Sequence, residues 1–244
     1  MDRMVFVAMS GAKQTMQAQE ANTHNLANTS TTGFRADLSQ FRTMPVFGEV
    51  YPTRVYAMAE RPGIDFSPGP VISTENELDV AIRGQGFIAV QAPDGNEAYT
   101  RAGDLRLNDG GVLTTGAGHP VIGNRGNITL PPHDRVEISP DGTISARLLG
   151  KSNAMVVLDR IKLVKPTLEK LKKGNDGLLR LEDGSPADQN SEVRVASRAV
   201  EGSNANPVDA LVTMISLQRQ FEMQVKMMKA EEDNATTAAK LLQI

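Results

Sequence analysis

The chain has 244 residues and a net charge of −3 with neutral histidines. Aromatic residues make up only 4% of it, and tryptophan and cysteine are absent. These values argue against a base-stacking nucleic-acid surface, which needs exposed rings and positive charge, and they exclude disulfides, thiol nucleophiles and thiolate zinc sites.

Glycine and proline divide the chain into three parts. Of the 21 glycines only two precede residue 48 and none follows Gly202, while the 13 prolines lie between Pro45 and Pro207. Because these residues punctuate turns, we expect helical ends around a β-rich middle. The expected fold class is α+β, with a discontinuous α-helical coiled-coil domain from both termini and a central all-β domain. Its parts are an N-terminal helix in 1–30, an extended connection with short strands in 31–75, the β domain in 76–204 and a C-terminal helix in 205–244.

The N-terminal segment shows no pattern of a cleavable signal. An apolar run from Met4 to Met9 is soon interrupted by Lys13, and no small-residue cleavage site follows it. No window approaches about 18 uninterrupted apolar residues, so we expect no direct membrane insertion. Any passage out of the cytoplasm would use a route that does not read a cleaved signal.

The first predicted helix has seam residues spaced alternately by four and three, as in coiled coils. They are Val5, Met9, Ala12, Met16, Gln19, Thr23 and Leu26. The polar members Gln19 and Thr23 weaken this seam. Ordinary packing within one domain is the alternative interpretation.

The following stretch, residues 31–75, contains five prolines and has no strong helical period. It is too long for an idle loop in a compact domain. We interpret it as an extended connection that lies against a neighbour.

The middle part alternates short apolar runs with turn residues, which is typical of a β-sandwich or barrel-like domain. Five pairs mark candidate hairpin turns: Asp94-Gly95, Asp109-Gly110, Asp141-Gly142, Asp176-Gly177 and Asp183-Gly184. The expected strands are Phe87–Val90, Val112–Thr114, Arg135–Ile138, Met155–Leu158 and Leu178–Leu181.

The C-terminal helix has a marked start and a clearer heptad pattern. Asn206 can cap it, Pro207 suits the first helical position, and Asp209 lies in the first turn. One column is Met214, Phe221, Met228, Ala235 and Leu242, and its companion is Leu211, Gln218, Val225, Glu232 and Ala239. Both terminal helices could pair with each other and with copies from neighbouring subunits.

Signals for chemistry are weak. Gly84 to Ala89 matches the dinucleotide pattern G-x-G-x-x-A, but the sequence continues as an alternating strand where such a site needs a helix. His24, His119 and His133 lack the i, i+4 spacing of a helical metal site. We therefore predict no catalytic, cofactor-binding or metal site.

A local basic segment lies between residues 160 and 173. It consists of Arg160, Lys162, Lys165, Lys170, Lys172 and Lys173. A solvated hairpin is one interpretation, and an electrostatic contact with an acidic partner or an anionic wall polymer is the other. The sequence leaves both open.

Four ordered blocks resemble the flagellar rod and hook family of axial proteins. They lie at Ala21–Arg35, Leu78–Phe87, Tyr99–Thr115 and Ser203–Glu222. The first is similar to the family motif A-N-N-L-A-N-x-x-T-x-G-F, with Thr23-His24 in place of a single residue. The second is similar to L-D-x-A-I-x-G-x-G-F. The third is similar to Y-T-R-x-G-x-F and G-x-L-x-T, with Leu105 where Phe is usual, and the fourth to S-N-V-x-P-V and Q-R-x-F-E.

The resemblance implies a structural subunit of the bacterial flagellar basal body and no enzyme. Such a protein assembles helically in the rod within the periplasm and transmits motor torque. Its partners would be other rod subunits, itself and paralogues included, and the flagellar export apparatus, with no nucleic acid. The opening residues resemble proximal rod members, and distal rod or hook-type paralogues are the alternative. A cell-wall-modifying enzyme and an adhesin-like β domain on a coiled stalk are alternatives from other classes.

The heptad columns and the family motif together assign an assembly interface. Its residues are Val5, Met9, Ala12, Met16, Asn22, Asn25, Leu26, Asn28, Thr32, Gly33, Phe34, Leu211, Met214, Gln218, Phe221, Val225, Met228, Ala235 and Leu242.

Overall fold

The computed structural model describes residues 4–45, 55–149 and 154–241. The chain forms two compact units. Unit 1 comprises Met1–Asn28, Ala36–Asp65 and Ala205–Ile244, and unit 2 comprises Thr29–Arg35 and Phe66–Asn204. Helices and strands both occur, so the mixed α+β class expected from the sequence is confirmed.

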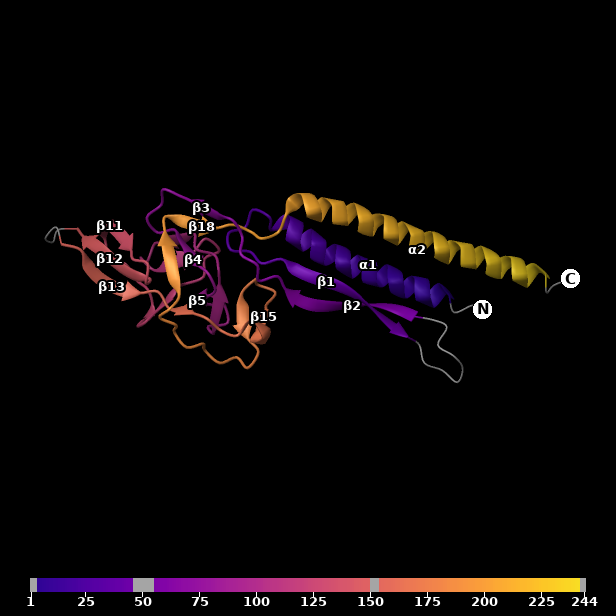
Figure 1. The fold of residues 1–244 in the computed structure, drawn as a ribbon, viewed down its shortest axis with the longest axis horizontal. Helices are drawn as coiled ribbons and strands as arrows, with labels where there is room; N and C mark the ends of the chain where they lie inside the picture. The colour runs from indigo at the N-terminus through magenta and orange to yellow at the C-terminus, as the bar shows by residue number, and fades with distance from the viewer. Residues whose placement is uncertain (1–3, 46–54, 150–153, 242–244) are drawn as a thin grey trace. The chain divides into compact units, whose positions relative to one another are not determined.

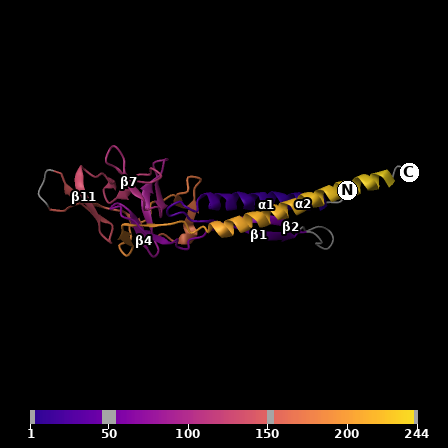
Figure 2. The same cartoon turned by 90° about the horizontal axis from the view of Figure 1, so that it is seen from above.

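Unit 1 combines two helices with one hairpin. They are α1 (Met4–Ala27), α2 (Pro207–Leu241), β1 (Asp37–Pro45) and β2 (Val55–Ile64). The helices lie side by side in both views, with the hairpin along α1 (Figures 1 and 2). They run antiparallel, because Asn22 donates a hydrogen bond to the Ala210 carbonyl at 2.7 Å while Thr15 contacts Gln224 at 3.3 Å.

Small residues on α1 allow this close helix packing. The buried stripe of α1 consists of Ala8, Gly11, Ala12, Thr15 and Ala18. A Cβ at Gly11 would lie 2.8 Å from the Gln224 side chain of α2. Glycine costs about 1 kcal/mol in a helix interior relative to alanine, and here it leaves room for the Gln224 side chain.

Unit 2 consists of strands and one short 3-10 helix, η1 (Leu168–Lys170), in its described residues. The strands are β3 (Val71–Ser73), β4 (Val80–Arg83), β5 (Phe87–Gln91), β6 (Glu97–Thr100), β7 (Leu105–Leu107), β8 (Leu113–Thr115), β9 (Ile122–Gly123), β10 (Gly126–Asn127), β11 (His133–Ile138), β12 (Thr143–Leu148), β13 (Val156–Arg160), β14 (Leu163–Val164), β15 (Leu171–Lys173), β16 (Leu179–Leu181), β17 (Arg194–Ser197) and β18 (Ala199–Glu201).

The strands of unit 2 pair antiparallel in several small sheets. A five-stranded sheet has the order β14-β5-β6-β16-β15, and a three-stranded sheet has the order β11-β12-β13. The pairs β17-β4, β18-β3, β7-β8 and β10-β9 complete the unit. One apolar core joins these sheets, and Ile88, Leu105, Leu113, Ile144 and Ile161 are almost completely buried in it.

The predicted strands are confirmed by β5, β8, β11, β13 and β16, which overlap the expected ranges. Four of the five Asp-Gly pairs connect hairpins, namely β5-β6, β7-β8, β11-β12 and β15-β16. The hairpin expected at Asp183-Gly184 is wrong, because β17 follows this turn and pairs with β4 rather than β16. The Asp183 carboxylate accepts hydrogen bonds from the Ser185 N–H and hydroxyl, so the turn itself forms locally without setting the next pairing.

The glycine-rich segment at Gly84 to Gly86 is a turn between β4 and β5, as predicted. Both glycines have positive φ, +78° and +146°. A strand follows where a nucleotide site would need a helix.

Candidate assembly surface and buried ion triad

One predicted column of α2 lies on the face that contacts α1. Met214, Phe221 and Met228 are half-buried. They lie on the same face of α2 as Ala210 and Gln224, which form hydrogen bonds with α1. The second column on this face is Ala210, Leu217 and Gln224, one residue away from the predicted companion column. Ala235 of the predicted column is exposed, and Leu242 lies outside the described residues.

The predicted companion column of α2 is turned away from α1. Leu211, Gln218 and Val225 are all exposed within the chain. On α1, the predicted Ala12 is buried and Leu26 is half-buried, whereas Val5, Met9 and Met16 are exposed. The single chain therefore covers only part of the predicted seams.

Each helix carries an exposed apolar patch. The outer α2 patch consists of Val208, Leu211, Val212 and Ile215, with 49–64% of each residue exposed. The outer α1 patch consists of Val5, Phe6, Met9 and Met16, with 38–59% exposed. Contiguous exposed apolar surface of this kind marks interaction sites.

The asparagines of the family-like motif tie the elements of unit 1 together. Asn22 binds α2, as described above, and Asn25 binds both backbone groups of Asp37 at the start of β1. The Asn28 side chain donates to the His24 carbonyl at 2.9 Å. Each of these predicted interface residues thus has a structural role inside the chain.

The end of the motif belongs to unit 2. Gly33 has φ +66°, and a Cβ there would lie 2.2 Å from the Ala102 nitrogen, so only glycine fits. Phe34 is buried, with the Lys173 ammonium 4.1 Å from its ring centroid. Thr32 hydrogen-bonds the Asp104 carboxyl, whose pKa is raised because burial outweighs this and other favourable contacts.

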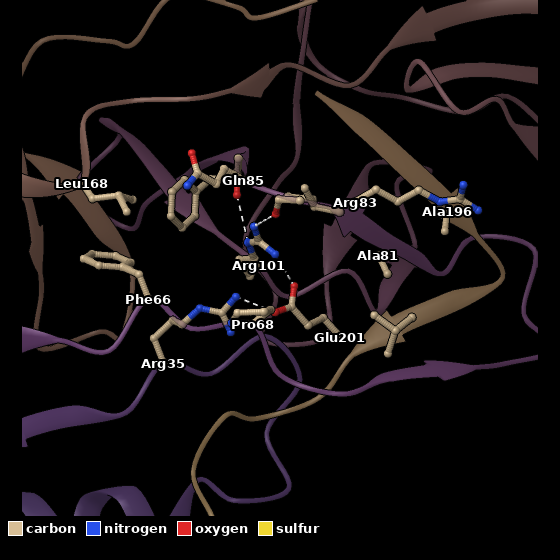
Figure 3. A pocket seen from close by; sticks show the side chains of 15 residues that line it. Arg35, Phe66, Pro68, Ala81, Arg83, Gln85, Arg101, Leu168, Ala196 and Glu201 are labelled. Carbon is tan, nitrogen blue, oxygen red and sulfur yellow. Dashed lines mark hydrogen bonds and ion pairs between the residues drawn. The ribbon is translucent and has the colours of Figure 1, made fainter. Parts of the chain in front are cut away.

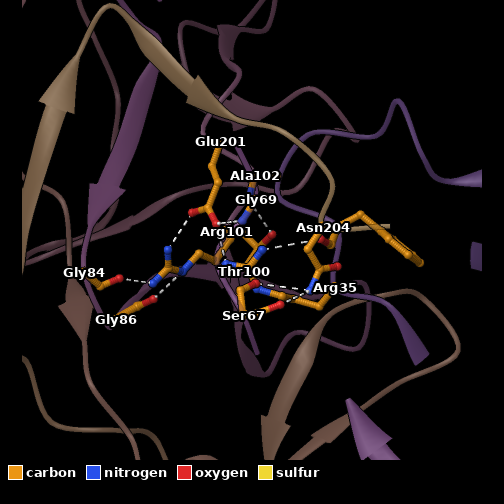
Figure 4. Close-up of polar contacts among 11 residues, drawn as sticks. Arg35, Ser67, Gly69, Gly84, Gly86, Thr100, Arg101, Ala102, Glu201 and Asn204 are labelled. Atoms are coloured by element: carbon orange, nitrogen blue, oxygen red, sulfur yellow. Dashed lines mark hydrogen bonds and ion pairs between the residues drawn. The ribbon is translucent and has the colours of Figure 1, made fainter. Parts of the chain in front are cut away.

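A buried triad of charges lies near these residues (Figure 4). Glu201 is 1% exposed, and its carboxylate accepts from Arg35 and Arg101, each at 2.5 Å. The Arg101 Nε donates to the Gly86 carbonyl at 2.9 Å, and its Nη2 donates to the Gly84 carbonyl. The triad therefore connects three distant chain segments with the β4-β5 turn.

The Glu201 carboxylate and the two guanidinium groups stabilise each other's charged forms. Burial raises the pKa of Glu201, but hydrogen bonds and charges from Arg101 and Arg35 outweigh it, so this pKa lies below its ordinary value. Burial likewise lowers the pKa of Arg101, and Glu201 opposes that change. The carboxylate is thus held ionised between two cations, which suits a structural link better than proton transfer.

A pocket of about 580 Å³ lies against the triad (Figure 3). Phe66, Phe87, Val71 and Leu168 contribute apolar walls, and Arg101 lies among the polar lining. Among the described residues that line it there is no histidine, and the one carboxylate is the Glu201 group already bound by two guanidinium groups. We find no arrangement of nucleophile, base and orienting group in this pocket.

The basic segment is largely paired within unit 2. Lys162 binds Glu97 at 2.8 Å and Lys172 binds Glu182 at 2.6 Å. The Arg160 Nε donates to the Asp141 carbonyl, and the Lys173 ammonium donates to the Arg35 carbonyl. These contacts show that four of its six cations are bound within unit 2, and the contact with an anionic partner stays untested. The segment is not a hairpin, because β14 pairs with β5 and β15 pairs with β16.

In the described part of the chain, no group of three or more acidic or histidine side chains is placed to hold a metal ion. None of the helices in that part combines the length and the apolar character needed to span a membrane.

Sequence reasoning missed the central role of Glu201. Arg35 and Arg101 stand inside family-like blocks, but Glu201 lies just before one, next to Gly202. The sequence does place a charged residue directly after the apolar pair Ala199-Val200. This pattern does not indicate which residues would bind the carboxylate.

Comparison with known proteins places these features in a family. Family models for the "Flagellar hook protein FlgE/F/G D1 domain" and the "Flagellar basal body rod FlgEFG protein C-terminal" match residues 81–146 and 196–241. The flagellar basal-body rod proteins FlgF of Escherichia coli (strain K12) and Salmonella typhimurium (strain LT2) are 42% and 41% identical, each over 99% of both chains. The rod protein FlgG of Buchnera aphidicola is 32% identical over 88% of this chain and 92% of its own. The chain belongs to the FlgF family of flagellar basal-body rod proteins.

Proposed function

We propose that the chain is a proximal rod subunit that assembles helically through its terminal helices and transmits motor torque across the periplasm. In the assembly, α1 and α2 form coiled-coil contacts with helices of neighbouring copies and paralogous rod proteins. The predicted interface residues that the chain leaves exposed lie at these contacts, and they are Val5, Met9, Met16, Leu211, Gln218, Val225 and Ala235. Export is through the flagellar export apparatus.

The outer α2 patch is the observation that carries this proposal. Four large apolar side chains recur at helical spacing on the side of α2 turned away from α1. Fully burying such a side chain stabilises a contact by about 1.5–3 kcal/mol. Because a helical assembly repeats its interface, this gain recurs at every subunit.

Family membership and the site's chemistry favour this function over the alternatives. The wall-modifying enzyme would need a base in the unit 2 pocket, where the carboxylate is already paired with two arginines. The FlgF proteins of Escherichia coli and Salmonella typhimurium, 42% and 41% identical over 99% of both chains, support a proximal over a distal rod subunit, since the FlgG protein of Buchnera aphidicola is 32% identical over 88% of this chain.

A matched pair of substitutions tests the interface. Ile215→Asp adds a charge to the outer α2 patch at a residue 54% exposed, and Val157→Asp makes the same kind of change on β13 at a residue 65% exposed. Both sites are exposed, so both chains should fold. We expect Ile215→Asp to be absent from purified basal bodies and to leave cells non-motile, whereas Val157→Asp is incorporated.

Phe221→Asp is less diagnostic, because Phe221 lies on the inner face of α2 and its loss also disturbs the helix pair within the chain. Normal motility with Ile215→Asp present in basal bodies would show that the outer α2 patch is not the assembly interface.

A further inference from the structure

The chain passes between its two units four times, after Asn28, Arg35, Asp65 and Asn204. We call the last three of these crossings the first, second and third passages. On the unit 2 side, the residues next to these three passages bind one another, although they are far apart in sequence.

Glu201 stands beside the third passage and forms hydrogen bonds to residues beside the other two. Its Oε1 accepts from the Arg35 guanidinium at 2.5 Å and from the Gly69 N–H at 2.9 Å. Its backbone carbonyl accepts from the Gly33 N–H at 2.7 Å. Glu201 itself stands just before the passage at Asn204, so one residue joins the first, second and third passages.

A second set of bonds repeats these connections. The Asn204 N–H donates to the Phe34 carbonyl at 3.4 Å, and its side-chain amide donates to the Ser67 carbonyl at 3.1 Å. The Gly202 N–H donates to the Pro70 carbonyl at 2.8 Å. The third passage is therefore bonded to both of the others, independently of the Glu201 side chain.

Arg101 attaches this set of contacts to the core of unit 2. It donates to Oε2, the second oxygen of the Glu201 carboxylate, at 2.5 Å. It also donates to the carbonyls of Gly84 and Gly86 in the β4-β5 turn. The packing is also tight where Glu201 binds Gly69, because a Cβ at Gly69 would lie 2.2 Å from the Gly202 carbonyl oxygen. The three charged side chains are only 1–6% exposed, and opposite charges attract one another more strongly at such buried positions than on the surface.

We propose that Glu201 is a positioning residue that clamps the three passages into one cooperative element, the passage clamp. We define it as Arg35, Gly69, Arg101 and Glu201 with the backbone of Gly33. Three unit 2 segments that are bonded at one point open together, whereas a segment with its own separate bonds could open alone. Where the proposed rod function holds, the load carried by the subunit passes through this clamp.

Amide hydrogen exchange of the full chain tests the clamp without any substitution. The N–H groups of Gly33, Gly69 and Gly202 each donate to another passage, so a clamp that opens as one element gives them the same protection. Protection factors that differ among the three by more than about tenfold would contradict a single cooperative element.

Substitutions sharpen this test. Arg35→Met removes one cation of the triad and should speed exchange at all three amides by about tenfold or more. Arg35→Lys keeps a cation and should restore most of their protection. Lys162→Met is the matched control, because it breaks the partly buried Lys162–Glu97 pair of 2.8 Å away from the passages. The clamp is disproved when Arg35→Met affects Gly33 alone, or when Lys162→Met loosens the three amides equally.

Motility separates the clamp from the rod function on which its load-bearing role rests. We expect Arg35→Met and Lys162→Met to enter basal bodies alike, and only Arg35→Met to slow swimming as medium viscosity rises. Equal swimming of the two variants would reject load transfer through the clamp. A failure of Ile215→Asp to block assembly would instead count against the proposed function and leave the exchange result standing.

Discussion

Asn25 on α1 and Asp37 at the start of β1 are joined by a pair of hydrogen bonds, as paired residues of neighbouring strands are. The Asn25 Nδ2 donates to the Asp37 carbonyl at 2.8 Å, and its Oδ1 accepts from the Asp37 N–H at 2.8 Å. A side-chain amide can offer one donor and one acceptor at the same time without carrying a charge. Asn25 therefore fixes where β1 starts relative to the end of α1.

We expect Asn25→Ala to destabilise unit 1 by about 2 kcal/mol, since it removes two hydrogen bonds worth about 1 kcal/mol each. Urea unfolding followed by the helical circular dichroism signal measures this. Thr23→Ala is the control, because its hydroxyl bonds only to the Gln19 carbonyl within α1. Equal midpoints for the two variants would contradict the role of Asn25.

Gly33→Ala should destabilise unit 2 more than Gly95→Ala. Both glycines have positive φ, which costs a side chain about 1–3 kcal/mol. A Cβ at Gly33 would also overlap the Arg101–Ala102 backbone at 2.2 Å, whereas nothing lies within 4 Å of one at Gly95. Thermal unfolding of the two variants measures the difference, and a smaller loss at Gly33 would show that this backbone can move aside.

Acid should weaken unit 2 through Glu201. The pKa of Glu201 is lowered in the folded chain, so the unfolded chain binds its proton first as pH falls. The stabilisation is complete above the ordinary glutamate pKa of about 4.3 and is lost as pH falls through the folded value. The free energy of unfolding, measured from neutral pH downward, records this loss.

Glu201→Gln supplies the comparison. Removing one partner of a buried ion pair costs about 3–5 kcal/mol, so the variant is less stable at neutral pH. Its stability should fall less steeply in acid, although Asp141 and Asp176, whose pKa values are also lowered, still contribute. Parallel pH profiles would mean that Glu201 is not the group responsible.

We expect high pH to destabilise unit 2 through ionisation of Tyr99. Burial raises the pKa of Tyr99 to about 12, although the hydrogen bond from the Ala187 N–H, 2.6 Å from the phenol oxygen, favours the phenolate. The stabilisation is complete below the ordinary tyrosine pKa of about 10 and is lost as pH rises through the folded value. An ultraviolet titration of the three tyrosines should show a late phenolate step that Tyr99→Phe removes. The same late step in Tyr99→Phe would assign it to another tyrosine.

Local signals in the sequence determined most of the secondary structure. Asn206 was expected to cap α2, and its side-chain oxygen accepts from the Val208 N–H at 3.0 Å. The Asp-Gly turns likewise act over two or three residues, so four hairpins could be predicted from their own sequences. Such interactions depend on neighbouring residues and not on where the rest of the chain lies.

Only the tertiary structure decided which segments meet. Columns of α2 that differ by one position carry similar apolar content, and the small residues on α1 select Ala210, Leu217 and Gln224 as the inner companion column. Glu201 and Arg35 bind at 2.5 Å across 166 positions, and no local pattern links them. A buried charge requires a partner, but the sequence does not say which of its 26 lysines and arginines will be brought within reach. That choice depends on chain topology, which brings together three passages far apart in sequence.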